Sequence, residues 1–208
     1  MAVDNPLKEI ATTEFDYNLL LYVLREYRFP RNKISRLLAS GELIRVKKGL
    51  YVGGGAPYSL PVLASMVYGP SYISQHYALA MYGLIPERVH TVTCMTLGRS
   101  KQFETPVGVF TYEPLPARLY GVGVRRAELS PTQPYQIATP EKAIVDIIWR
   151  RKDLSSVDAL EDYLIHDLRL DLDQRHSYSL SRIGKIERVY KKKPVTALAA
   201  VIAKRLGS

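Results

Sequence analysis

The segment from Pro30 to Val52 constrains the fold more than any other part of the chain. Residues 30–40 carry apolar side chains at helical spacing among basic ones. Residues 44–52, IRVKKGLYV, place two short β-forming runs on either side of a Lys-Lys-Gly turn. Two such runs around a short glycine-containing turn predict a β-hairpin, here with a positively charged tip. The sequence therefore predicts a basic helix that leads almost directly into a basic hairpin.

A further helix is predicted before this pair. It spans residues 15–28, with apolar side chains at helical spacing and Asp16 as its N-cap. Pro30 ends it, because the residue before a proline is disfavoured in the α region. The next helix runs from Arg31 to Ser40 and ends at Gly41, where glycine can adopt a left-handed conformation. Its apolar positions, expected in the core, are Ile34, Leu37 and Leu38.

Two helices followed by a hairpin are typical of a winged helix-turn-helix, which presents its second helix and its hairpin to DNA. Asn32 and Arg36 lie opposite the apolar positions of that helix, with Ser35 on the flank; an amide can pair with adenine and a guanidinium with guanine. The side chains expected to neutralise phosphates are Arg31, Lys33, Arg45, Lys47 and Lys48. The alternative is an ordinary charged turn and an ordinary surface arginine.

Charge favours a polyanionic partner without identifying it. The chain has 29 Lys and Arg against 20 Asp and Glu, a formal net charge of +9. Residues 25–52 hold eight basic and two acidic side chains, residues 153–173 one basic and seven acidic, and residues 182–206 eight basic and one acidic. This alternation suggests electrostatic docking within the chain or between copies of it; the alternative is a set of solvated helix faces.

The predicted domain boundary falls at Gly53-Gly54-Gly55, interpreted as a flexible linker, so residues 1–55 and 56–208 form separate domains. After it, helices are predicted at 62–68 and 72–82, and strands at 90–95, 107–112, 123–129 and 136–137, with a basic turn at 98–101. Thr139-Pro140-Glu141 starts a further helix. Residues 151–208 read as helices, at 156–167, 180–192 and after Pro194.

The sequence contains no arrangement of residues that is typical of an enzyme active site. The four histidines are scattered, and His76 is expected to be packed or hydrogen-bonded within a helix. Cys94, the single cysteine, is expected to be a buried hydrophobe, and it excludes an intrachain disulfide. Asp171 and Asp173 could hold a metal but fit a solvated acidic tail better. We therefore expect no enzyme, no cofactor and no metal site.

Four segments resemble, in order and spacing, the AbiEi-type antitoxins of type IV toxin-antitoxin and abortive-infection systems. They are GELIRVKKGLYV (41–52), GPSYISQHYALAMYGLIPE (69–87), HTVTCMTLGRSKQFETPVGVFTYEPLP (90–116) and QIATPEKAIVDII (136–148). The resemblance spans about Asp16 to Trp149. We expect the apolar side chains of the second segment in the core: Tyr72, Ile73, Tyr77, Ala80 and Met81.

The resemblance implies an N-terminal winged helix on operator DNA and a C-terminal antitoxin domain. It also implies repression of the protein's own operon, and a partner toxin that looks like a nucleotidyltransferase. The family's DNA-contacting role carries over onto Arg31 to Ser40 and onto the hairpin around Lys47 and Lys48. One departure is that a winged helix usually has three helices before its wing; Pro6 to Ala11 is the candidate for a short first helix.

The overall expectation is an α+β protein: a winged helix-turn-helix followed by a mixed α/β domain with a helical C-terminus. We expect a DNA-binding autorepressor and antitoxin, with operator DNA and the toxin as partners and self-association on DNA. The N-terminus has no apolar signal core and no apolar run is long enough for a membrane, so we expect a cytoplasmic location. Two alternatives remain: a module that neutralises a partner protein without binding DNA, and a nuclease that uses Asp171 and Asp173.

Overall fold

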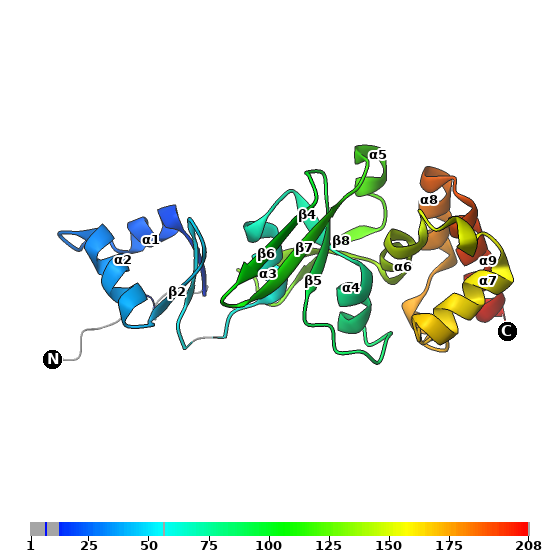
Figure 1. The fold of residues 1–208 in the computed structure, drawn as a ribbon, viewed down its shortest axis with the longest axis horizontal. Coiled ribbons are helices and arrows are strands. Elements are labelled where there is room, and N and C mark those ends of the chain that lie inside the picture. The colour runs from blue at the N-terminus through cyan, green and yellow to red at the C-terminus, as the bar shows by residue number, and fades with distance from the viewer. Residues whose placement is uncertain (1–6, 8–12, 56, 208) are drawn as a thin grey trace.

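The computed structural model describes residue 7, residues 13–55 and residues 57–207, and the chain has a mixed α+β fold. Its elongated shape has a small N-terminal unit at one end and a larger unit beyond it (Figure 1). The elements of the N-terminal unit are β1 Glu14–Asp16, α1 Tyr17–Val23, α2 Pro30–Ala39, β2 Leu43–Lys47 and β3 Leu50–Gly53. The three strands form an antiparallel sheet in the order β1-β3-β2.

Both predicted helices of this unit form, with different bounds. Asp16 caps α1 as predicted, since its Oδ1 accepts a hydrogen bond from the Leu19 N–H at 2.7 Å. However, residues 14–16 pair as a strand with β3, and α1 already ends at Val23. The predicted cap therefore gave the correct start of the helix, but Phe15 lies in a strand, because periodicity does not reveal a strand partner far along the chain. The predicted end at residue 28 was too late. Of the proposed first helix, 6–11, all but Leu7 lies outside the described residues.

The predicted hairpin is confirmed, and its two faces pack into different cores. Leu43 and Tyr51 join a cluster with Ile34 and Leu37 of α2, whereas Leu50 and its neighbours Val46 and Val52 belong to the core of the larger unit. Alternate residues of a strand point to opposite faces, so the sheet is buried on both sides. In Figure 1 it lies between the two helices and the rest of the molecule.

The interpretation of residues 53–55 as a flexible linker was wrong for its first two glycines. Gly53 is buried at the end of β3, and the Gly54 N–H donates to the Glu42 carbonyl at 2.8 Å. A Cβ on Gly54 would lie 1.8 Å from the carbonyl oxygen of Gly41. Glycine is required at 54 because two backbone segments touch there, which a sequence of three glycines does not distinguish from a linker.

The larger unit is built on a six-stranded mixed sheet in the order β6-β7-β5-β4-β9-β8. Its strands are β4 Ser71–Ile73, β5 Val92–Thr96, β6 Lys101–Thr105, β7 Gly108–Pro114, β8 Val124–Glu128 and β9 Pro134–Ala138. The helices that accompany it are α3 Leu60–Val67, α4 Gln75–Met81, α5 Ala117–Tyr120 and α6 Pro140–Ile148. Strands β5, β7, β8 and β9 agree with the predicted ones, while β6 and α5 were not predicted.

The predicted helix over 72–82 is divided. Tyr72 and Ile73 lie in β4, which pairs antiparallel with β5 and parallel with β9, and α4 begins only at Gln75. A short, fully buried strand has no polar alternation, so periodicity cannot separate it from a helix. Both side chains are buried as expected. Tyr77 and Ala80 are half-buried, and Met81 is exposed, contrary to the prediction.

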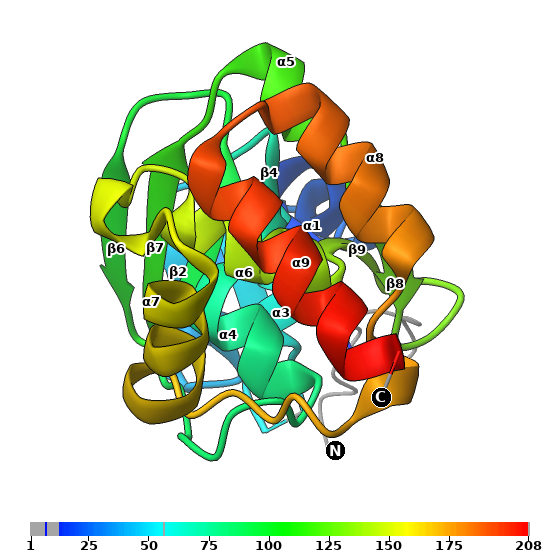
Figure 2. The same ribbon diagram turned by 90° about the vertical axis from the view of Figure 1, so that its right-hand side faces the viewer.

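Of the C-terminal helices, the last two pack against α6 and the first packs against the last (Figure 2). They are α7 Val157–Asp162, which continues as a π-helical turn to Asp167, α8 Leu180–Tyr190 and α9 Lys193–Gly207. The Thr139 hydroxyl caps α6 as predicted, accepting from the Lys142 N–H.

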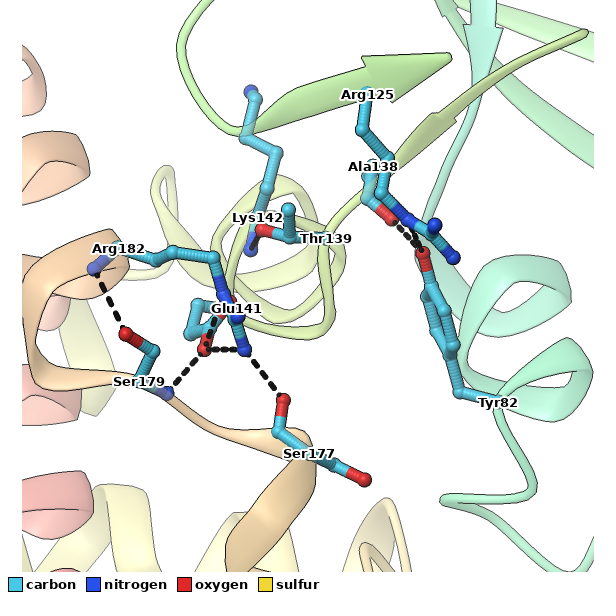
Figure 3. A network of polar contacts seen from close by, with 9 residues as sticks. All are labelled: Tyr82, Arg125, Ala138, Thr139, Glu141, Lys142, Ser177, Ser179 and Arg182. Atoms are coloured by element: carbon cyan, nitrogen blue, oxygen red, sulfur yellow. Dashed lines mark hydrogen bonds and ion pairs between the residues drawn. The ribbon is translucent and has the colours of Figure 1, made fainter. Parts of the chain in front are cut away.

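Electrostatic docking within the chain is confirmed for part of the charged segments. Glu161 of α7 forms ion pairs with Lys204 at 2.9 Å and Arg205 at 2.6 Å on α9. Glu141 of α6 is fully buried and accepts from the Arg182 guanidinium and from the Ser179 N–H, which joins α6 to the start of α8 (Figure 3). The acidic and basic segments therefore meet inside one chain.

Candidate nucleic-acid interface

The outer face of α2 is polar and basic. Ile34 and Leu37 are buried against α1 and the hairpin, as predicted, while Leu38 is half-buried. The opposite face of the helix is exposed, and its residues are Arg31, Asn32, Ser35, Arg36 and Ala39. Helix α2 contains no acidic residue, and Pro30 occupies its first position. The sequence thus predicted this face correctly, because a 3.6-residue period fixes which side chains share it.

The start of α2 borders a shallow hollow of about 280 Å³. Its lining residues are Tyr27, Arg28, Phe29, Asn32, Lys33 and Arg36. Aromatic and cationic side chains alternate here: the Lys33 Nζ lies 5.3 Å from the Tyr27 ring centre, and the Arg28 guanidinium 5.2 Å from that of Phe29. Sequence reasoning missed Arg28 and Phe29, although their place directly before Pro30 was a usable signal.

The hydroxyl proton of Ser35 is already used in a hydrogen bond within the protein. Its hydroxyl donates to the Arg31 carbonyl at 3.2 Å, within α2, so only its oxygen lone pairs remain for another donor. The side chain is a weaker candidate for reading a base than Asn32 or Arg36.

The hairpin residues divide into two groups. Arg45 is exposed, with its guanidinium 5.9 Å from the Tyr51 ring centre, and Lys48 is exposed in the turn. The turn itself is held against α1, since the Gly49 carbonyl accepts from the Tyr17 N–H at 3.0 Å. Gly49 has a φ of +85°, which accounts for glycine at this position.

Lys47 points into the larger unit instead. Its ammonium donates to the Val67 carbonyl at the end of α3 and lies 5.8 Å from the Phe103 ring centre. Burial, and then the charge of Lys101, lower the pKa of this lysine. Because the ammonium already binds a protein carbonyl, we assign Lys47 to the contact between the units and not to the exposed basic surface.

A buried charged cluster lies in the interior of the larger unit. Lys142 and Asp146, one helical turn apart on α6, form an ion pair with both side chains fully buried. The Asp146 carboxylate also accepts from the hydroxyls of Tyr72 at 2.8 Å, Ser74 at 2.7 Å and Tyr190 at 3.0 Å. Burial lowers the pKa of Lys142 against the opposing effect of Asp146. With each oxygen of Asp146 accepting two hydrogen bonds, the cluster joins β4, α6 and α8.

The residues considered for catalysis are placed apart. Cys94 is buried, as predicted, and burial raises the pKa of its thiol. His76 on α4 was predicted to be packed or hydrogen-bonded, and it is exposed to solvent on one side, while partial burial lowers the pKa of its imidazole. Asp171 accepts from the Asp173 N–H and the Gln174 amide, and Asp173 lies 3.9 Å from Arg205. Over the described part of the chain, no three His, Cys, Asp or Glu side chains are grouped as metal ligands.

Neither a family model nor a curated protein sequence matches this chain. Within the ranges that the structure describes, no helix combines the length and the apolar character needed to cross a bilayer.

Proposed function

We propose that the protein binds duplex DNA through the outer face of α2. The observation that carries the proposal is that Arg31, Asn32 and Arg36 are exposed together on a helix without acidic residues. A helix that enters the major groove needs cations for phosphates and planar hydrogen-bonding groups for base edges, and this face has both.

The order of elements supports a winged helix-turn-helix arrangement for this unit. Helices α1 and α2 are followed directly by the β2–β3 hairpin, and its exposed Arg45 and Lys48 add positive charge. In this proposal Arg31, Lys33, Arg45 and Lys48 contact phosphates, while Asn32 and Arg36 face the bases.

We further propose that this DNA binding represses the protein's own operon, and that the protein is the antitoxin of a type IV toxin-antitoxin pair in the cytoplasm. Support for this part is the resemblance of its four segments to AbiEi-type antitoxins. The partner is then a nucleotidyltransferase-like toxin, which need not be touched by the antitoxin. Co-expression with the neighbouring reading frame tests it: growth arrest caused by that gene alone should be relieved by this protein, and unrelieved arrest would contradict the antitoxin role.

DNA binding is tested with a fluorescent duplex from the protein's own promoter, titrated at several salt concentrations. Affinity should fall steeply with salt, by about 0.9 in the logarithmic slope for each phosphate contact. We expect Arg31→Ala to weaken binding to all sequences and to reduce this slope. Arg36→Ala should cost about 1–3 kcal/mol and relax sequence preference.

Lys185→Ala is the control, because Lys185 is an exposed lysine on α8 in the other unit. Unchanged affinity of both α2 variants, or binding that is insensitive to salt, would contradict the proposed interface.

One observation favours a second function, a protein-binding module. Tyr22 on α1 and Phe29 at the N-cap of α2 are 64% and 59% exposed, and exposed aromatic side chains are common anchors of protein interfaces. A stoichiometric partner protein whose binding is lost in Phe29→Ala, together with absent DNA affinity, would support this function in place of the first.

A further inference from the structure

A basic hollow of about 640 Å³ is lined by residues that follow α6 and by residues of the α8–α9 junction. Helices α8 and α9 lie at the end of the molecule farther from α2 (Figure 1). The lining of the hollow includes Trp149, Arg150, Lys152 and Ser155 from the segment after α6, and Lys192 and Lys193 from the α8–α9 junction. Its volume falls in the range of small-molecule sites, roughly 300–1,000 Å³. A second hollow, about 340 Å³, continues from it past Lys191 and Thr196.

The charge of this hollow is not neutralised by its own lining. Of the described residues, none with a carboxylate lines it, and Lys152, Lys192 and Lys193 form no ion pair with another described residue. Arg151, which also borders it, is the exception, because Asp153 holds its guanidinium at 2.6 Å. Several uncompensated cations around one concave surface create a positive potential that attracts an anion.

The side chain of Trp149, the aromatic residue that lines the hollow, is held in place by its neighbours. Trp149 packs edge-on against Tyr190, with ring centres 6.0 Å apart, and the Arg150 guanidinium stacks 4.4 Å from the indole ring centre. Arg150 also donates to the Pro114 carbonyl at 3.1 Å. A stacked guanidinium held in this way keeps its remaining N–H groups in a fixed fork, a geometry that suits phosphate oxygens.

We propose that this hollow binds the phosphate groups of a free nucleotide, such as a nucleoside triphosphate. The lysines at the α8–α9 junction and Lys152 would neutralise the polyphosphate, Arg150 would donate to its oxygens, and the indole lies beside it. This site is separate from the DNA-binding face of α2 and does not depend on it.

The chain contains a single tryptophan, so Trp149 fluorescence reports directly on this site. The full-length protein is titrated with ATP, with inorganic tripolyphosphate and with adenosine. We expect saturable changes with the first two and none with adenosine, and weaker binding at higher salt. The proposal is overturned if neither phosphate compound binds, or if adenosine gives the same response as ATP.

The test variant is Lys192→Gln with Lys193→Gln, for which we expect at least about ten-fold weaker binding of tripolyphosphate. Its matched control is Lys185→Gln with Arg175→Gln, which removes two exposed charges outside the hollow and should bind as the unmodified protein does. Equal affinity of the two double variants would overturn the proposal, once thermal unfolding shows that both are folded.

Two further results separate this site from the DNA interface. Arg36→Ala should bind ATP normally even where it loses DNA. Displacement of ATP by duplex DNA in the Arg36→Ala variant, in which the α2 interface is impaired, would make the hollow part of a nucleic-acid surface and overturn the nucleotide proposal.

Discussion

At the scale of single residues, the most consequential position is Lys142, a charged side chain with no exposed surface. Its ammonium is held by Asp146 and by the Tyr190 hydroxyl. A buried charge is tolerated only when it is paired and hydrogen-bonded, because desolvation otherwise costs several kcal/mol. Its sequence spacing, a lysine four residues before an aspartate, equally fits a solvated helix pair, so burial could not be predicted.

Replacing this lysine should be strongly destabilising. We expect Lys142→Met to lower the free energy of unfolding by about 3–5 kcal/mol, because Asp146 keeps its burial and loses its cation. Urea unfolding measures this, with Lys185→Met as an exposed control expected within about 0.5 kcal/mol. The double variant Lys142→Met with Asp146→Leu should lose less than the sum of the two single changes. A cost for Lys142→Met no larger than that of the control would show that the pair does not act as described.

At the scale of elements, the β2–β3 hairpin is the joint between the two units. One of its faces completes the α1–α2 core, and the other enters the core of the larger unit. Glu14 on β1 adds a polar contact, since its buried carboxylate accepts from the Ser59 N–H at 2.7 Å and from the Gln133 amide at 3.0 Å. A hairpin with this role is fixed on both faces, unlike one that projects into solvent.

At Gly54, beside the hairpin, the backbone approaches the Gly41 carbonyl too closely for a Cβ atom. We expect Gly54→Ala to destabilise the protein by about 1–3 kcal/mol or more, because the added methyl group would collide with the Gly41 carbonyl. Gly121→Ala is the matched control, with no heavy atom within 4 Å of its added Cβ and a φ of −82°. Thermal unfolding compares the two variants, and equal melting temperatures would contradict the close approach.

At the scale of the whole molecule, the distribution of buried tyrosines gives a pH dependence. Burial raises the pKa of Tyr72, Tyr112 and Tyr190, and that of Tyr120 to about 12. In the unfolded chain a tyrosine loses its proton near pH 10. Above that pH the folded state binds more protons than the unfolded one, so stability falls as pH rises. Lys142 and Lys47, whose pKa values are lowered, have the opposite effect, but they are two groups against four tyrosines.

Alkaline titration should therefore unfold the protein. We expect the free energy of unfolding to decrease from about pH 10 upward. The absorbance of tyrosinate should show part of the tyrosines titrating only together with loss of helical circular dichroism. Ionisation of all tyrosines near pH 10 with the fold intact would contradict the burial of these hydroxyls.

The sequence by itself determined the features that depend on neighbours along the chain. The caps at Asp16 and Thr139, the face of α2 that carries Asn32 and Arg36, and the hairpin turn at Gly49 follow from helical period, hydrogen-bonding side chains and backbone conformation. Those interactions act within a few residues, so local pattern was enough.

The tertiary structure decided what depends on partners far away in the chain. It made residues 71–73 a strand between β5 and β9, turned Lys47 toward Val67, and buried Lys142 beneath α8. It also gathered Trp149, Lys152 and Lys192 around one hollow. None of these pairings produces a periodic pattern in the sequence, because contacts between distant segments form only when the whole core assembles.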